Sequence, residues 1–109
     1  MTISIRNVGP AKIVEVNGDV DLSTSGALRR TLLDALPVAS ILALNLKAIR
    51  YIDSSGIATL IEVLNDSRRL NKQFVLFGLS TAVEEVFRLT HVIRIFRIVQ
   101  TEQEAVGAL

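Results

Sequence analysis

The sequence contains no cysteine and no tryptophan, and its only histidine is His91. Without cysteine the chain cannot form disulfides or thiolate metal sites, and one histidine cannot build a histidine cluster. Only Asp19, Asp21 and Asp53 remain as oxygen ligands that could gather near one another. We therefore expect no metal site and no cofactor bound by this chain.

Motifs that carry familiar enzyme chemistry are also missing. No glycine stands two residues before Ser54 or Ser55, so the sequence has no G-x-S-x-G elbow for a nucleophilic serine. No G-x-x-x-x-G-K stretch is present, which excludes a P-loop. We expect no catalytic residues and a protein that is not an enzyme.

Positive and negative charges are nearly balanced: the chain has 12 basic and 11 acidic residues, and its net charge is +1. Such a balance provides no field that would attract nucleic acid or an anionic membrane. The longest apolar run, ILALNL, is far shorter than a membrane-spanning helix needs, and the first residues, MTISIRNVG, do not follow the pattern of a signal peptide. We expect a cytoplasmic protein that neither binds nucleic acid nor inserts into a membrane.

What the sequence has instead is aliphatic residues, since half of its 109 residues are hydrophobic and only five are aromatic. This length and composition predict one domain, over residues 1–109, with a core of Leu, Ile, Val and Ala. Period-2 and helical spacings predict the elements in the order β-β-α-β-α-β-α-β-α. This order predicts an α/β fold in which helices pack on a mixed, mostly parallel sheet.

The predicted strands begin with a hairpin around Gly9 and Pro10. Apolar residues on both faces predict a central strand, which we expect to end before a loop at residues 47–50. Alternation in VIRIFRIV predicts a last edge strand. The strands are expected at residues 2–8, 11–18, 40–46, 73–78 and 92–99.

The stretch YIDSSG, residues 51–56, joins the central strand to the second predicted helix. Asp53 or Ser54 can cap that helix by accepting a hydrogen bond from a free amide, and Gly56 can relax the tight entry. Ser54 can also be a phosphoacceptor, because a hydroxyl at a helix start faces solvent. The two interpretations are compatible.

A phosphate on Ser54 would add about −1.5 to −2 charges beside Asp53, with Asp19 and Asp21 close by. We expect amides at the helix start to compensate part of this charge, so that the fold survives. A docking partner would have to desolvate the dianion beside carboxylates, and would bind more weakly. The modification is thus expected to act as a binding switch.

An aspartate after a central strand is also typical of a response-regulator receiver, in which acidic neighbours hold Mg²⁺ around a phosphorylated aspartate. Asp53 has the right position. A receiver also uses a lysine after its last strand, whereas the last lysine here is Lys72, and the opening hairpin does not fit.

Four stretches match a known family in order and spacing: NGDVD at 17–21, LNL at 44–46, YIDSSG at 51–56 and STAVEEVFRLT at 80–90. On these residues the chain resembles a single-domain STAS protein of the anti-sigma factor antagonist family. The resemblance implies the STAS fold and a partner-switching role in transcription regulation. It also implies a partner, a serine kinase/anti-sigma factor of the GHKL type, which is bound when Ser54 is unphosphorylated so that a sigma factor is released.

The same resemblance implies that the kinase phosphorylates Ser54, that ATP and Mg²⁺ belong to the kinase, and that a PP2C-type phosphatase reverses the reaction. Relatives often carry a second glycine where this chain has Ala58, which leaves the partner open. The alternative is a STAS subunit of a stressosome or of a lipid or anion transporter complex.

The partner surface is expected around the motif and along the second helix. We expect the exposed side of this helix, which continues from the motif, to carry Thr59, Glu62, Val63 and Asp66, with Val63 as an apolar anchor. The predicted partner-binding residues are Asp21, Asp53, Ser54, Ser55, Gly56, Thr59, Glu62 and Val63.

Overall fold

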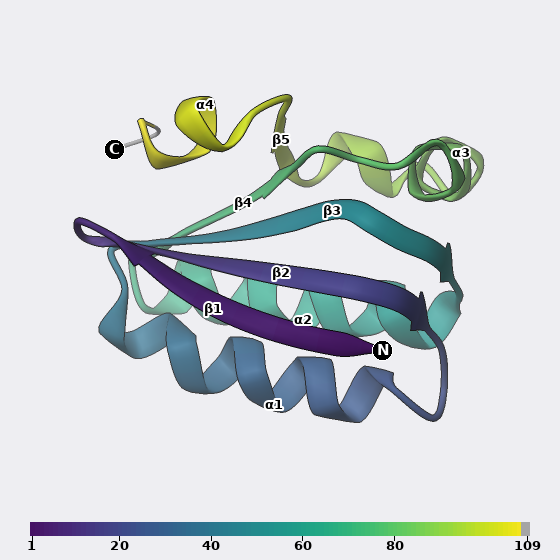
Figure 1. Ribbon diagram of the computed structural model, residues 1–109, viewed down its shortest axis with the longest axis horizontal. Coiled ribbons are helices and arrows are strands. Elements are labelled where there is room, and N and C mark those ends of the chain that lie inside the picture. Colours follow the sequence, from purple (N-terminus) through teal and green to yellow (C-terminus); the bar gives the residue numbers. More distant parts are fainter. Residues whose placement is uncertain (108–109) are drawn as a thin grey trace.

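The computed structural model describes residues 1–107 and has one five-stranded sheet with the strand order β1-β2-β3-β4-β5. β1 runs antiparallel to β2, and the other neighbours are parallel. The α/β architecture and the predicted order of elements are confirmed (Figure 1). The strands are β1 Thr2–Val8, β2 Ala11–Val20, β3 Ile41–Ile52, β4 Gln73–Phe77 and β5 Arg97–Val99.

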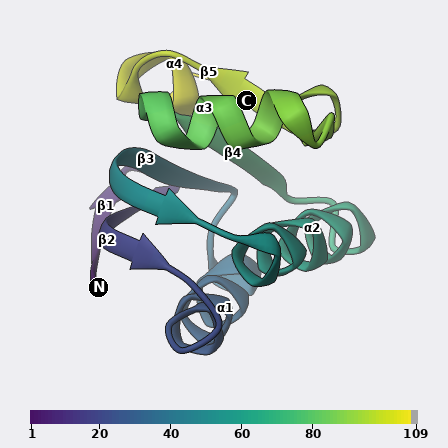
Figure 2. The same ribbon diagram turned by 90° about the vertical axis from the view of Figure 1, so that its right-hand side faces the viewer.

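Three helices connect the parallel strands, and a fourth follows the last strand. They are α1 Ser25–Ala35, α2 Ser54–Arg69, α3 Thr81–Leu89 and α4 Glu102–Val106, with short 3-10 turns η1 Leu36–Val38 and η2 Val92–Arg94. Figure 2 shows α1 and α2 together on one side of the sheet and α4 on the other. Among residues 1–107 no helix is both long and apolar enough to cross a membrane.

Two apolar clusters hold these layers together. Leu28 and Leu32 of α1 and Leu60 of α2 are fully buried in the cluster that also contains Leu44 of β3. On the opposite face, Ala105 of α4 packs in a smaller cluster with Ile13 and neighbouring strand residues. The first half of β3 is covered on both faces and is apolar apart from Asn45, as the sequence predicts for a central strand.

The central strand is longer than the sequence predicts. The expected loop at residues 47–50 is instead part of β3, which continues to Ile52 alongside β2. Register shifts after Glu15 and Gly18 keep the two strands paired up to Val20 and Ile52. The polar residues Lys47 and Arg50 made this stretch look like a loop in the sequence. Their side chains are exposed because the second half of β3 is solvated on one face.

The last predicted strand is shorter than expected. Residues 92–94 form the turn η2, and only Arg97–Val99 pair with β4. His91 precedes this turn with a φ of 63°, which breaks the extended chain. Phe96 then turns inward and stacks on Phe87 with ring centroids 5.8 Å apart, so the alternating pattern is satisfied by a turn followed by a short strand.

Candidate functional site

The site lies where β2 and β3 end side by side. Val20 pairs with Ile52 in the last step of the parallel register, and the Asp53 amide donates to the Val20 carbonyl at 3.2 Å. Asp21 and Asp53 follow these two strand ends directly. The parallel pairing therefore brings together two carboxylates that are far apart in the sequence.

Asp53 is the N-cap of α2. Its Oδ1 atom accepts hydrogen bonds from the Ser55 amide at 2.9 Å, the Ser55 hydroxyl at 2.5 Å and the Gly56 amide at 3.4 Å. Its own carbonyl accepts the first helical bond, from Ile57. These contacts fix the point at which the strand becomes a helix, and the cap predicted from the sequence is formed by Asp53.

Asp21 organises the loop between β2 and α1 in a similar way. Its Oδ1 accepts from the Ser23 hydroxyl at 2.7 Å, the Ser23 amide at 2.9 Å and the Thr24 amide at 3.2 Å. The Thr24 hydroxyl in turn donates to the Asp19 carbonyl at 2.9 Å. The loop is thereby held as a turn that keeps the Asp21 carboxylate beside the start of α2.

Both carboxyls are acidic because they accept several hydrogen bonds. The Ser55 hydroxyl, with the Gly56 and Ser55 amides, holds the pKa of Asp53 below its usual value, against partial desolvation and the nearby charge of Asp21. The hydroxyl of Ser23 is the main cause of a lowered pKa at Asp21. Both groups are therefore anionic at neutral pH, and the site is a negatively charged edge.

The two serines of the motif have different surroundings. Ser54, the first residue of α2, is exposed, and none of the side-chain hydrogen bonds within residues 1–107 involves its hydroxyl. Ser55 is half-buried and its hydroxyl donates to Asp53. The accessibility that the phosphoacceptor hypothesis requires is present at Ser54; phosphorylation itself stays a prediction.

Gly56 is buried where α2 approaches the ends of both strands. A Cβ at this position would lie 2.7 Å from Cγ1 of Ile52 and 2.8 Å from Cγ1 of Val20, closer than carbon atoms can pack. Gly56 therefore allows the close contact between helix and sheet. Because it is buried, its role is in packing, and it offers little surface to a partner.

Besides Gly56, two more of the predicted partner-binding residues are buried. Thr59 is 6% exposed and Val63 is fully buried, so the expectation that they lie on the outer face of α2 is wrong. α1 packs against α2, and Val63 belongs to the same buried cluster as Leu28 and Leu32 of α1. A fully buried Val63 cannot serve as an apolar anchor for a partner.

Glu62 is at the surface, but its carboxylate is already paired. The Arg29 guanidinium of α1 binds it through Nε at 2.9 Å to both carboxylate oxygens and through Nη2 at 2.6 Å to Oε2. This pair joins the outer sides of α1 and α2. A partner that contacts Glu62 in this arrangement also meets Arg29.

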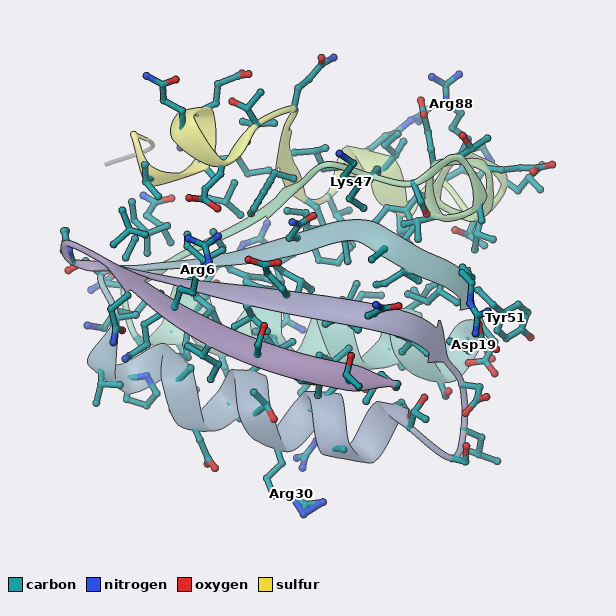
Figure 3. The ribbon with its side chains drawn as sticks, in the orientation of Figure 1. Arg6, Asp19, Arg30, Lys47, Tyr51 and Arg88 are labelled. Atoms are coloured by element: carbon teal, nitrogen blue, oxygen red, sulfur yellow. The ribbon has the colours of Figure 1, made fainter. Side chains whose placement is uncertain are left out.

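Two exposed apolar side chains lie at this edge and are not among the residues predicted from the sequence. Leu22 is 83% exposed in the loop after Asp21, and Tyr51 is 51% exposed on β3, two residues before Asp53. Figure 3 shows Tyr51 beside Asp19 at the end of the sheet, in agreement with their pairing across β2 and β3. A leucine placed inside a run of polar loop residues was the available sequence signal.

The three aspartates that could have offered oxygen ligands do not form a metal site. Within the part of the chain that the structure describes, no group of three His, Cys, Asp or Glu residues is arranged to hold a metal ion. Asp19 is instead 3.6 Å from Nε of Arg50. The observed hairpin of β1 and β2 also argues against the receiver alternative.

Comparison with known proteins gives a consistent picture. A family model described as the STAS domain matches residues 2–105. The chain is similar to a putative anti-sigma factor antagonist from Thermotoga maritima, with a TM-score of 0.88, 21% identity, and coverage of 96% of this chain and 92% of that chain.

Two further solved structures have the same fold. An anti-sigma factor antagonist from Mycobacterium paratuberculosis gives a TM-score of 0.86 at 21% identity, covering 98% of this chain and 92% of that chain. The Bacillus cell fate determinant SpoIIAA in its phosphorylated form gives 0.74 at 16% identity, with 97% of each chain covered. At such low identities the similarity demonstrates a shared fold.

The close packing at Gly56 gives a first prediction. Gly56→Ala should lower the free energy of unfolding by about 1–3 kcal/mol, because the added methyl overpacks the contact with Val20 and Ile52. The matched control is Gly26→Ala in α1, where a Cβ meets no atom within 4 Å, and which should be neutral or stabilising by up to about 1 kcal/mol. Urea unfolding measures both; equal effects would contradict the packing role.

The lowered pKa of Asp53 predicts how the stability of the protein changes at acidic pH. Because the folded-state pKa lies below that of the unfolded chain, about 3.9, the unfolded state binds more protons and stability falls as pH falls through this range. Asp53→Asn keeps an acceptor oxygen but does not titrate. Wild type should be the more stable protein at pH 7, and the difference should shrink below about pH 4.

The measurement is the urea midpoint of both proteins between pH 7 and pH 3. Asp34→Asn is the control for losing one negative charge, because Asp34 is exposed near the far end of α1. A difference between wild type and Asp53→Asn that stays constant over this range would contradict the assignment.

Proposed function

Because the chain belongs to the STAS domain family, whose model matches residues 2–105, we propose that it is an anti-sigma factor antagonist switched by phosphate on Ser54. In the unphosphorylated form it binds a serine kinase/anti-sigma factor, and a sigma factor is released. The observation that carries this proposal is the exposed Ser54 hydroxyl at the start of α2, next to the carboxylates of Asp53 and Asp21. The shared fold with SpoIIAA in its phosphorylated form supports it.

The partner is proposed to be a kinase of the GHKL type, which supplies ATP and Mg²⁺, and a PP2C-type phosphatase is proposed to restore the hydroxyl. This chain contributes only the acceptor and the surface around it. Its residues then act by recognition, without a catalytic group or a cofactor of their own.

The charge of the site explains how one phosphate can switch binding. The unphosphorylated edge presents two carboxylates, Asp21 and Asp53, that a basic partner surface can neutralise. A phosphate on Ser54 adds up to two further negative charges in the middle of this edge. In an interface these anions would lose their hydration while they repel one another, and both effects make the binding free energy less favourable. Affinity falls tenfold for every 1.4 kcal/mol of binding free energy lost.

Leu22 and Tyr51 give this charged surface an apolar component. Both are exposed within the edge that carries Asp21 and Asp53, and an apolar side chain that fills a partner pocket commonly contributes most to an interface. We therefore propose that they, and not the buried Val63, are the apolar contacts of the docking surface. The partner is expected to present an apolar pocket with basic residues around it.

The switch predicts distinct behaviour for two substitutions. Ser54→Asp should weaken binding to the cognate kinase/anti-sigma factor by at least about tenfold, because a fixed negative charge occupies the acceptor position. Ser54→Ala should bind like the unphosphorylated wild type and should stay bound when ATP is added. Isothermal titration calorimetry measures both affinities.

Ser40→Asp is the matched control, because it adds the same charge at an exposed position beside the start of β3, at the opposite end of the sheet. It should change affinity less than about threefold. If kinase and ATP labelled Ser54→Ala as well as wild type, the acceptor assignment would be wrong. Recovery of a transporter permease or a stressosome scaffold as the only partner would instead support the alternative role.

The apolar contacts predict a second affinity change. Leu22→Ala and Tyr51→Ala should each weaken binding by about fivefold to thirtyfold, corresponding to about 1–2 kcal/mol. Val38→Ala is the control, since Val38 is 72% exposed and lies past the far end of α1. Surface plasmon resonance compares the three variants, and equal losses would remove the special role of the edge.

A further inference from the structure

The site has two neighbouring hydroxyls, those of Ser54 and Ser55, to which the proposed phosphate could be attached. They belong to the first two residues of α2, and both would be within reach of an enzyme that recognises this helix start. The structure distinguishes them sharply. Ser54 is exposed, whereas Ser55 is half-buried. The Ser55 hydroxyl donates a hydrogen bond to Oδ1 of Asp53, with the two oxygens 2.5 Å apart.

We propose that Asp53 selects the phosphoacceptor: by holding the Ser55 hydroxyl and amide on one carboxylate oxygen, it withholds Ser55 and leaves Ser54 as the available nucleophile. This inference rests on the proposed function, because it concerns the same phosphorylation. It assigns to Asp53 a positioning role in addition to capping the helix.

The chemistry of phosphoryl transfer explains why a hydrogen bond can decide the acceptor. The serine oxygen attacks the γ-phosphorus of a nucleoside triphosphate, and an O–P bond forms as the bridging P–O bond breaks and the nucleoside diphosphate leaves. The hydroxyl proton passes to a general base of the kinase. A productive serine must therefore turn its lone pair toward phosphorus and its hydrogen toward that base.

Ser55 cannot satisfy this requirement without losing its bond to Asp53. Its hydrogen points at Oδ1, and the same oxygen also accepts the Ser55 and Gly56 amides at 2.9 Å and 3.4 Å. Rotating the hydroxyl outward breaks a hydrogen bond to a charged acceptor, which is stronger than a neutral one. The product would also place a phosphate against a carboxylate that the helix amides hold in position.

Asp53 is also a poor base for Ser55 in its own right. Its acceptor oxygen is stabilised as a carboxylate by two amides and a hydroxyl, and the same bonds lower its pKa. Accepting a proton would weaken the cap that begins α2. The contact therefore restrains Ser55 and does not activate it.

Ser54 escapes this restraint because of its place in the cap. Asp53 is the N-cap of α2, and its side chain accepts hydrogen bonds from the amides of the second and third helix residues, Ser55 and Gly56. It makes no such bond to the first residue, Ser54. The Ser54 side chain consequently lies outside the ring of hydrogen bonds. Selection thus follows from the same geometry that begins the helix.

The absence of cysteine allows a direct test without the kinase. Ser54→Cys and Ser55→Cys each introduce a single thiol into the full chain, and the rate of alkylation by iodoacetamide at pH 8 reports how available each side chain is. The Ser54→Cys variant should react about tenfold faster or more. Equal rates would overturn the proposal.

Substitutions at Asp53 then test the cause. Asp53→Ala, combined with each cysteine variant, should reduce the ratio of the two rates to below about threefold, mainly by accelerating the position-55 thiol. Asp53→Asn retains an acceptor oxygen and should preserve most of the ratio. A ratio that Asp53→Ala leaves unchanged, or that Asn and Ala reduce equally, would overturn the assignment to this hydrogen bond.

Comparing the two thiols within one background cancels a general loosening of the helix start, and circular dichroism verifies that each variant is folded. A second arm maps phosphate on wild-type protein after incubation with the cognate kinase and ATP. Occupancy confined to Ser54 supports the selection, and comparable occupancy of Ser55 overturns it. If no serine is labelled, the proposed function fails, while the thiol rates still decide whether Asp53 restrains Ser55.

Discussion

The hydrogen bonds accepted by Oδ1 of Asp53 are the contacts on which the site depends. They end β3, begin α2 and determine which side chains of the motif point outward. The Asp53 amide adds a bond to the Val20 carbonyl, which ties this junction to β2 and thus to the loop that carries Asp21. One residue therefore connects the central strand, the helix and the second acidic loop of the proposed docking surface.

Most of the fold could be predicted because it follows from local rules. Alternation and helical spacing gave the order of elements, and the apolar first half of β3 gave its central place in the sheet. The length of β3 could not be read in this way. Its second half pairs with β2 through shifts in register, which are a property of the two strands together and leave no signal in either sequence alone.

The docking face was less predictable, because it depends on what covers α2. A helix on a sheet alone would bury one narrow stripe, but α2 packs against both the sheet and α1, and its buried residues include Thr59 and Val63. Threonine is a typical surface residue, so its burial against a second helix cannot be foreseen from spacing. Conversely, Leu22 looks like a core residue but lies in a loop that Asp21 holds away from the core.

The arrangement of amides at the start of α2 determines how a phosphate there would act. The sequence suggested that free helix amides would compensate its charge, but the Ser55 and Gly56 amides already donate to Asp53. A phosphate on Ser54 could accept from these amides only by displacing the Asp53 carboxylate. The carboxylate would then lose the compensation that the phosphate gained, so the added negative charge of the edge would not be reduced. The added charge is therefore directed outward, toward whatever binds this edge. The proposed switch would need no rearrangement of the fold, since the hydrogen-bonded junction at Asp53 would present either a hydroxyl or a dianion at the same place.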